Sequence, residues 1–196
     1  PAIVHGEREI LHRDLDGLVR RTAAWLAAQG IGRGDIIGVA LGDTAEHLIA
    51  MFALGALGAV ILPMDCRWTL GEQERVATHF KAKMALLEPA APWGDVTPAL
   101  RCDAAWRAGV SEQAPLLELA QGDVMPLLLS LLSGTTGMAK GPLVTHRQFL
   151  GRFWAHWINL GLNAQSHYVS ATPLYFGGGR IFALSQMFKV VFGLGA

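Results

Sequence analysis

An α/β fold of mainly parallel sheets covered by helices is predicted for this chain of 196 residues, on three observations. Hydrophobic residues make up 52% of the sequence and charged residues only 16%, so the chain can bury a sizeable core. Short, continuous apolar runs alternate with helical patterns, which is typical of parallel strands that helices cover on both faces. The 23 glycines are frequent for a chain of this length and gather at particular places.

The first helix is expected over residues 15–26, where apolar side chains recur at helical spacing. Asp14 can cap its start, and Gly30 can take a left-handed turn at its end. Residues 36–41 then form a short apolar run, which we interpret as a buried strand.

Asp43 and Glu46 have the spacing of a capping box and predict a second helix that Gly58 ends, followed by a strand at residues 60–62. The uncharged stretch over residues 47–64 approaches the ~20 apolar residues of a membrane span. Glycines interrupt it and a proline ends it, so a helix followed by a strand is favoured and a membrane span is the minority alternative.

The second half of the chain continues the alternation. Thr69 and Glu72 repeat the capping-box spacing and predict a third helix. Prolines break the pattern over residues 88–121, which is expected to be loop, edge structure or linker. The remaining expected strands are 85–87, 127–132, 143–144 and 168–170, and the remaining expected helices are 146–157 and 181–188.

Composition excludes several functional classes. Lys and Arg total 16, as do Asp and Glu, and a neutral chain without a basic run predicts no nucleic-acid partner. Cys66 and Cys102 are too few for a disulfide scaffold or a cysteine-rich zinc module, and they fit the reducing cytoplasm. The histidines show no metal-ligand spacing, so no metal site is expected in this segment.

Residues 133–141 carry the clearest chemical signal, because three glycines, three hydroxyls and one lysine directly follow an apolar strand. Glycines let backbone N–H groups converge on an anion, hydroxyls donate to phosphate oxygens, and Lys140 adds a positive charge. A Walker A loop is excluded because it needs Gly-Lys-Ser/Thr. A plain Gly/Thr turn is the alternative, but three hydroxyls with a lysine favour phosphate binding.

This stretch resembles the signature loop of the adenylate-forming (AMP-dependent) synthetase superfamily, Ser-Gly-Thr-Thr-Gly-x-Pro-Lys-Gly, with Ala139 in place of the usual proline. That superfamily includes acyl-CoA synthetases, peptide-synthetase adenylation domains and luciferases. Gly34-Asp35, residues 55–63 and Val144-Thr145-His146 are similar to further family segments in the same order. The resemblance therefore spans nearly the whole chain.

The resemblance implies two half-reactions. A carboxylate attacks the α-phosphate of ATP to give an acyl-adenylate and pyrophosphate, and a thiol, usually that of coenzyme A, then takes the acyl group. The implied small molecules are ATP, coenzyme A, Mg²⁺ and a carboxylic acid; the Mg²⁺ ligand is implied to lie outside this segment, and no catalytic residue is assigned within it. The implied phosphate-binding residues are Ser133, Gly134, Thr135, Thr136, Gly137 and Lys140.

Residues 172–179 resemble the family's Pro-Leu-x-His-x-x-Gly motif, which implies an acyl-substrate pocket. Phe176 stands where many members have histidine, so it keeps a ring but loses any proton or hydrogen-bond role. An ordinary core phenylalanine and a flexible glycine turn are the alternatives here, and Arg67 is interpreted as a solvated charge. The implied pocket residues are Tyr175, Phe176, Gly177 and Gly178.

By the resemblance, residues 1–196 are the N-terminal portion of the large ATP- and acyl-binding domain, and the rest of that domain and the mobile C-terminal domain are absent. The expected function is that of an ATP-dependent carboxylate–CoA ligase in fatty acid metabolism, inactive if the chain ends at 196. The alternatives are an amino-acid adenylation domain of a peptide synthetase and a non-catalytic nucleotide-binding module. A cytoplasmic location is expected, and the oligomeric state is open, with a dimer as one alternative.

Overall fold

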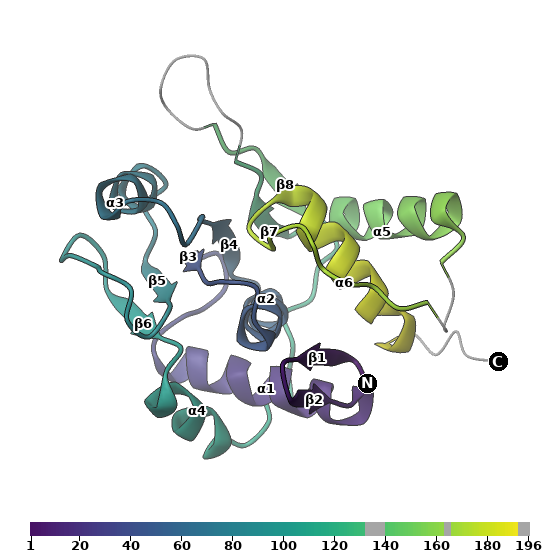
Figure 1. The fold of residues 1–196 in the computed structure, drawn as a ribbon. Helices are drawn as coiled ribbons and strands as arrows, with labels where there is room; N and C mark the ends of the chain where they lie inside the picture. Colours follow the sequence, from purple (N-terminus) through teal and green to yellow (C-terminus); the bar gives the residue numbers. More distant parts are fainter. Residues whose placement is uncertain (132–139, 163–165, 192–196) are drawn as a thin grey trace.

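The computed structural model describes residues 1–131, 140–162 and 166–191, with backbone only for 186–191 (Figure 1). Its centre is a six-stranded sheet with the strand order β6-β5-β3-β4-β7-β8. All neighbouring strands run parallel except β7 and β8, which pair antiparallel. The strands are β3 (Ile36–Ala40), β4 (Val60–Pro63), β5 (Met84–Leu87), β6 (Ala99–Arg101), β7 (Pro126–Leu129) and β8 (Leu143–Thr145).

Helices cover the sheet on both faces, which confirms the predicted fold class (Figure 1). The helices are α1 (His12–Ala28), α2 (Ala45–Leu57), α3 (Leu70–His79), α4 (Ala104–Ser111), α5 (His146–Leu160) and α6 (Gly177–Val191). Side chains from α1, α2, α4, α5 and α6 enter one buried apolar cluster, whereas α3 contributes to a second cluster.

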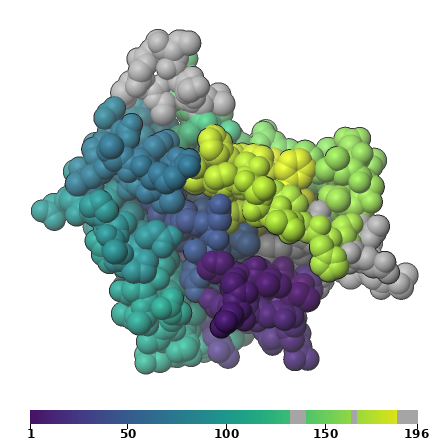
Figure 2. All heavy atoms as spheres, viewed as in Figure 1, coloured from purple at the N-terminus to yellow at the C-terminus, as the bar shows by residue number. Residues whose placement is uncertain are grey.

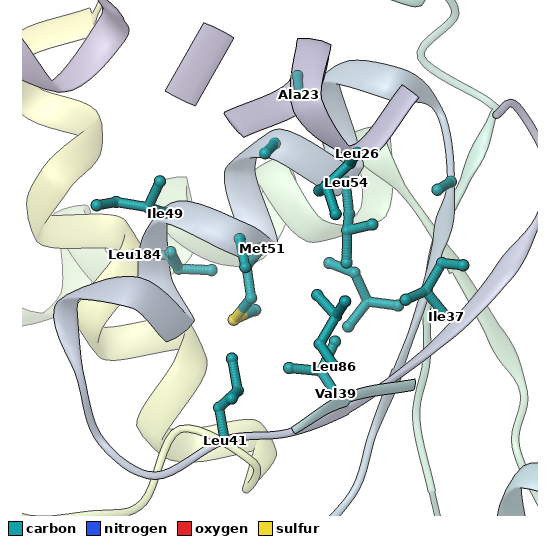
Figure 3. Close-up of a cluster of buried hydrophobic side chains, with 14 of the residues drawn as sticks. Ala23, Leu26, Ile37, Val39, Leu41, Ile49, Met51, Leu54, Leu86 and Leu184 are labelled. Atoms are coloured by element: carbon teal, nitrogen blue, oxygen red, sulfur yellow. The ribbon is translucent and has the colours of Figure 1, made fainter. Parts of the chain in front are cut away.

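Successive strand residues alternate between these two clusters. Ile61 enters the first cluster and its neighbour Leu62 the second, and Leu86 and Leu87 divide in the same way. Because both faces of the central strands β3, β4 and β5 are buried, these strands read as unbroken apolar runs rather than as an alternation of polar and apolar residues. Figure 3 shows part of the first cluster, where helical Leu26 gathers with strand residues of the sheet.

Two of the predicted helix caps are wrong. Asp14 lies inside α1, which begins after Leu11 without a side-chain cap, so its carboxylate is an acidic group in the first turn instead. Thr44, rather than Asp43, caps α2 by accepting a hydrogen bond from the backbone N–H of His47. The predicted left-handed glycines at the ends of α1 and α2 are confirmed, since Gly30 has φ +85° and Gly58 has φ +70°.

The structure also differs from the sequence interpretation in three segments. Residues 168–170 form no strand. The Val169 side chain is 85% exposed, so it does not pack against the sheet. The segment 88–121, expected to be loop, edge structure or linker, contains edge strand β6 and also helix α4. A two-stranded hairpin, β1 (Ile3–His5) and β2 (Arg8–Ile10), precedes α1, and the sequence pattern does not predict it.

The uncharged stretch over residues 47–64 folds as most of α2 followed by β4, as the favoured interpretation predicts. Across the residues that the structure describes, none of the helices has the length and apolar character needed to cross a membrane.

Candidate functional site

The candidate site lies at the edge of the sheet where the parallel strands end. After β3 the chain continues to β4 on one side, and after β4 it crosses to β5 on the other side of β3. Helices α2 and α3, which follow these two strands, therefore pack on opposite faces of the sheet. Open α/β sheets bind ligands outside the carboxyl ends of their strands at such a change of direction.

The turn after β3 brings two distant segments to this edge. Glu88, which follows β5, accepts a hydrogen bond from the backbone N–H of Gly42. Asp43 accepts one through Oδ1 from the backbone N–H of Leu174, at 2.8 Å and 131 positions away in the sequence. Asp43 is thus a connector between the end of β3 and the segment that precedes α6, and it is not the helix cap that its spacing suggested.

The turn after β4 contains an ion pair between an acidic and a basic side chain. Asp65 accepts hydrogen bonds from Arg67 Nε at 3.1 Å and from Arg67 Nη2 at 3.0 Å, so the ion pair is bidentate. Burial alone would raise the pKa of Asp65, but the hydrogen bonds from Arg67 outweigh it and hold that pKa below its ordinary value. The Arg67 side chain is 69% exposed, as a solvated charge would be, yet it is paired.

Arg67 also donates to the hydroxyl of Tyr175, with its guanidinium carbon 5.2 Å from the centre of the Tyr175 ring. This contact joins the end of β4 to the predicted acyl pocket segment. Figure 2 shows the corresponding surfaces, with the segment around residues 170–190 adjoining the one around residues 60–80. Cys66 lies in the sequence between Asp65 and Arg67, and its thiol pKa is raised first by burial and then by nearby carboxylates, so it is not an activated nucleophile.

The predicted pocket residues differ in how much open space surrounds them. A Cβ added at Gly177 or Gly178 would meet nothing within 4 Å, whereas one at Gly179 would lie 2.3 Å from the carbonyl oxygen of Pro173. Gly179 is therefore required by close packing, and the first two glycines leave open space at the start of α6. Phe176 is 55% exposed and stacks obliquely on Tyr175 at 5.0 Å, which is not the environment of an ordinary core phenylalanine.

The glycine-rich stretch begins and ends at the same edge. The backbone N–H of Ser130, just after β7, donates to the carbonyl oxygen of Pro142 at 3.0 Å, so the two ends of the loop meet. A Cβ at Gly141 would come within 2.8 Å of the Phe80 ring, which explains the glycine at that end. Lys140 is exposed. The other predicted phosphate-binding residues, Ser133, Gly134, Thr135, Thr136 and Gly137, lie outside the described residues.

Helix α5 starts directly after this loop and strand β8. Thr145 accepts a hydrogen bond from the N–H of Gln148, and the Gln148 side chain accepts one from the N–H of Thr145, which forms a capping box. His146 anchors the helix start, since its backbone N–H donates to the carbonyl oxygen of Met125 at 3.0 Å. Burial lowers the pKa of His146, which keeps its ring neutral at neutral pH.

Sequence reasoning missed two residues that shape this site, Asp43 as a connector and Arg180. Arg180 is 3% exposed within α6 and donates through Nη1 to the carbonyl oxygens of Leu174 and Tyr175. A signal was available, because Arg180 directly precedes the apolar run over residues 181–184, at the start of an expected helix. Its role could not be assigned without knowing what the helix packs against.

Comparison with known proteins gives one family. A family model described as "AMP-binding enzyme" matches residues 1–192. Phosphinothricin tripeptide synthetase from Streptomyces viridochromogenes is 31% identical over 153 residues, which cover 74% of this chain and 14% of that protein. The 2-succinylbenzoate–CoA ligase of Bacillus licheniformis is 25% identical over 200 residues, which cover 98% of this chain and 40% of the enzyme.

Solved structures agree on the fold. The O-succinylbenzoate–CoA synthetase of Bacillus subtilis, in complex with AMP, superposes with a TM-score of 0.80 at 22% identity and covers 97% of this chain and 49% of that one. The N-terminal subdomain of Klebsiella oxytoca NpsA gives a TM-score of 0.79 at 22% identity, covering 96% and 48%. This chain thus spans less than half the length of each of these four relatives.

Proposed function

This chain belongs to the AMP-binding enzyme family, and from that membership we propose that it is the N-terminal part of an ATP-dependent carboxylate–CoA ligase. One observation carries the proposal. The two ends of the glycine-rich loop, the Asp65–Arg67 turn and the Tyr175–Gly178 segment converge at the carboxyl edge of the parallel strands. A phosphate-binding loop and an acid-binding wall at one edge suit the joining of a carboxylate to ATP.

In the proposed reaction, the carboxylate oxygen attacks the α-phosphate of ATP, the bond to the β-phosphate breaks, and pyrophosphate leaves. Lys140 is free to turn its ammonium toward the departing phosphates, since it is exposed. Positive charge brought to the place where negative charge develops stabilises such a transition state. Ser133, Gly134, Thr135, Thr136 and Gly137 are proposed to complete the phosphate contacts through hydroxyls and backbone N–H groups.

The acid would lie against Tyr175 and Phe176 with the open space at Gly177 and Gly178 beside it. Phe176 supplies a planar apolar surface and no proton. Magnesium would be held mainly by the phosphates of ATP and by one or two carboxylates, and the family resemblance implies that its protein ligand lies outside this segment. No step is therefore assigned to it.

A second candidate is an amino-acid adenylation domain, which would pass its acyl group to a carrier thiol rather than to coenzyme A. The 31% identity with phosphinothricin tripeptide synthetase favours it. The match to 2-succinylbenzoate–CoA ligase favours the first candidate, because it extends over 98% of this chain.

Product analysis with the intact protein separates the two candidates. The protein is incubated with ATP, magnesium, and a panel of aryl, short-chain and long-chain acids and amino acids, with and without coenzyme A. The CoA-ligase proposal predicts that one acid class yields an acyl-CoA that mass spectrometry detects. An aminoacyl-adenylate that coenzyme A leaves unchanged would support the second candidate, and no acid-dependent pyrophosphate under any condition would contradict both.

A further inference from the structure

We propose that Asp43 and Arg180 act together as positioning residues that hold the backbone of Leu174, and with it the Tyr175–Phe176 wall, in place for the acid substrate. We call this pair with its bound peptide the Leu174 clamp. The clamp itself is a structural inference, whereas its effect on the acid rests on the proposed function.

Arg180 forms one side of the clamp. Its Nη1 donates to the carbonyl oxygen of Leu174 at 3.0 Å and also to that of Tyr175. The side chain is only 3% exposed, and within the described part of the chain it forms no ion pair with a carboxylate, while its Nε has no hydrogen-bond partner. Burial lowers the pKa of Arg180 to about 10, so the guanidinium is still charged at neutral pH.

Asp43 forms the other side. Its Oδ1 accepts from the N–H of Leu174 at 2.8 Å. Leu174 is therefore held at its N–H by a carboxylate and at its carbonyl by a guanidinium, and hydrogen bonds that involve a charged partner are about twice as strong as neutral ones. The Leu174 side chain is also buried at 2% exposure, so the residue is fixed through both backbone and side chain.

Burying a guanidinium without a paired carboxylate costs free energy, and an apolar residue would pack in α6 without that cost. The compensation lies in the two carbonyl oxygens that Arg180 reaches, and these belong to the residues that enter the predicted acyl pocket. With Leu174 held, Tyr175 meets Arg67 at the end of β4, and Phe176 projects its ring outward. The clamp thus sets where the pocket wall stands relative to the sheet.

Arg20 offers a matched control elsewhere in the molecule. Its Nη1 likewise donates to two consecutive backbone carbonyls, those of Leu116 at 3.0 Å and Leu117 at 3.4 Å. Neither Leu116 nor Leu117 belongs to the edge of the sheet where the site lies. Arg20→Met therefore removes the same kind of carbonyl contact, together with an exposed ion pair to Asp16, without touching the Leu174 clamp.

The first arm of the test is kinetic and uses the intact protein with the acid that it activates. Arg180→Met and Asp43→Ala each remove a charged hydrogen-bond partner of Leu174 and should raise the KM for the acid roughly tenfold. The KM for ATP should stay within about twofold, and Arg180→Lys should recover part of the loss because it keeps the charge. Arg20→Met should leave both KM values unchanged.

The second arm needs no activity. Hydrogen–deuterium exchange of a peptide that spans residues 172–177 should become about tenfold faster in Asp43→Ala, which removes the acceptor of the Leu174 N–H, and in Arg180→Met, which loosens the same segment at its carbonyl oxygens so that it opens more often. Arg20→Met should change exchange only around Leu117. Unchanged exchange in Arg180→Met would overturn the clamp, and faster exchange with an unchanged KM for the acid would overturn its positioning role.

The two arms also separate this inference from the proposed function. If the unaltered protein releases no pyrophosphate with any acid, the proposed function fails, and the acid-positioning part fails with it. The exchange rates then still decide whether the Leu174 clamp exists.

Discussion

Neighbouring glycines at the start of α6 have different reasons to be glycine. Gly179 sits against backbone, where an added Cβ would lie only 2.4 Å from the carbonyl oxygen of Thr172, whereas Gly178 faces open space. The motif resemblance predicted a glycine-lined pocket at this point. It could not tell which glycine is needed for packing and which leaves room for a ligand, because that difference depends on backbone from another segment.

Alanine at each position makes this distinction measurable. Gly179→Ala should lower the free energy of unfolding by about 2 kcal/mol, as overpacking against rigid backbone does. Gly178→Ala should keep or slightly raise stability, since alanine favours helix, but it should raise the KM for the acid if the acid occupies that space. Thermal unfolding of both variants checks the first claim, and equal melting temperatures for the two would contradict it.

His47 predicts a pH dependence of stability. It is 1% exposed, its Nδ1 lies 3.0 Å from the carbonyl oxygen of Gly42, and burial is the main cause that lowers its pKa from 6.5 to about 4. The unfolded chain therefore binds a proton between pH 6.5 and 4 that the folded protein does not bind. Stability should be fully present above about pH 6.5 and should fall as the pH falls toward 4.

For His47 alone, the expected loss between about pH 7 and about pH 5 is about 2 kcal/mol. Urea unfolding at the two pH values measures it. His47→Asn keeps a donor for Gly42 but does not titrate, so its stability should change less over this range. Equal pH slopes for the variant and the unaltered protein would show that His47 is not the group responsible.

Helices α4 and α5 both begin with a side-chain cap, but the two caps lie in different parts of the molecule. Thr145 caps α5 directly after the glycine-rich loop and β8, whereas Asp103 caps α4 after edge strand β6, accepting from the N–H of Trp106 at 3.0 Å (Figure 1). The cap of α5 holds the helix start that follows the loop and β8. The cap of α4 fixes only the helix.

Alanine at either cap should lower the free energy of unfolding by about 1 kcal/mol. Thr145→Ala should in addition raise the KM for ATP severalfold, because the loop end is less well held, and Asp103→Ala should leave that KM unchanged. Denaturation curves and ATP saturation curves of the two variants provide the comparison. A KM for ATP that shifts equally in both would mean that the α5 cap has no specific link to the loop.

Among the helices and strands, the sequence predicted those features that depend on neighbouring residues. The capping box of Thr69 with Glu72, the left-handed Gly58 and the buried strands all follow from short-range spacing and are confirmed. Residues 168–170 and α4 were misassigned, because tertiary packing rather than local pattern decides their structure. Asp43 has the spacing of a helix cap, yet its carboxylate accepts a hydrogen bond from the distant N–H of Leu174.

Across the whole molecule, the order of motifs predicted the family, and the family match over residues 1–192 confirms it. The sheet order was not readable from the sequence, because the crossing from β4 to β5 on the far side of β3 is a long-range choice. That crossing creates the edge where the loop ends, the Asp65–Arg67 pair and the Leu174 clamp converge. These contacts join segments that lie far apart in the sequence, so local patterns could not predict them.

The central claim is that this edge takes part in the formation of an acyl-adenylate, and acid-dependent exchange of labelled pyrophosphate into ATP by the intact protein tests it most directly. Lys140→Ala should slow the exchange by about 100-fold, as loss of a transition-state charge contact does. Lys83→Ala is the matched control, because its ammonium pairs with Asp35 at 2.7 Å, away from the loop. The exchange should need both the acid and Lys140; exchange unaffected by Lys140→Ala would contradict a part for this edge in adenylate formation.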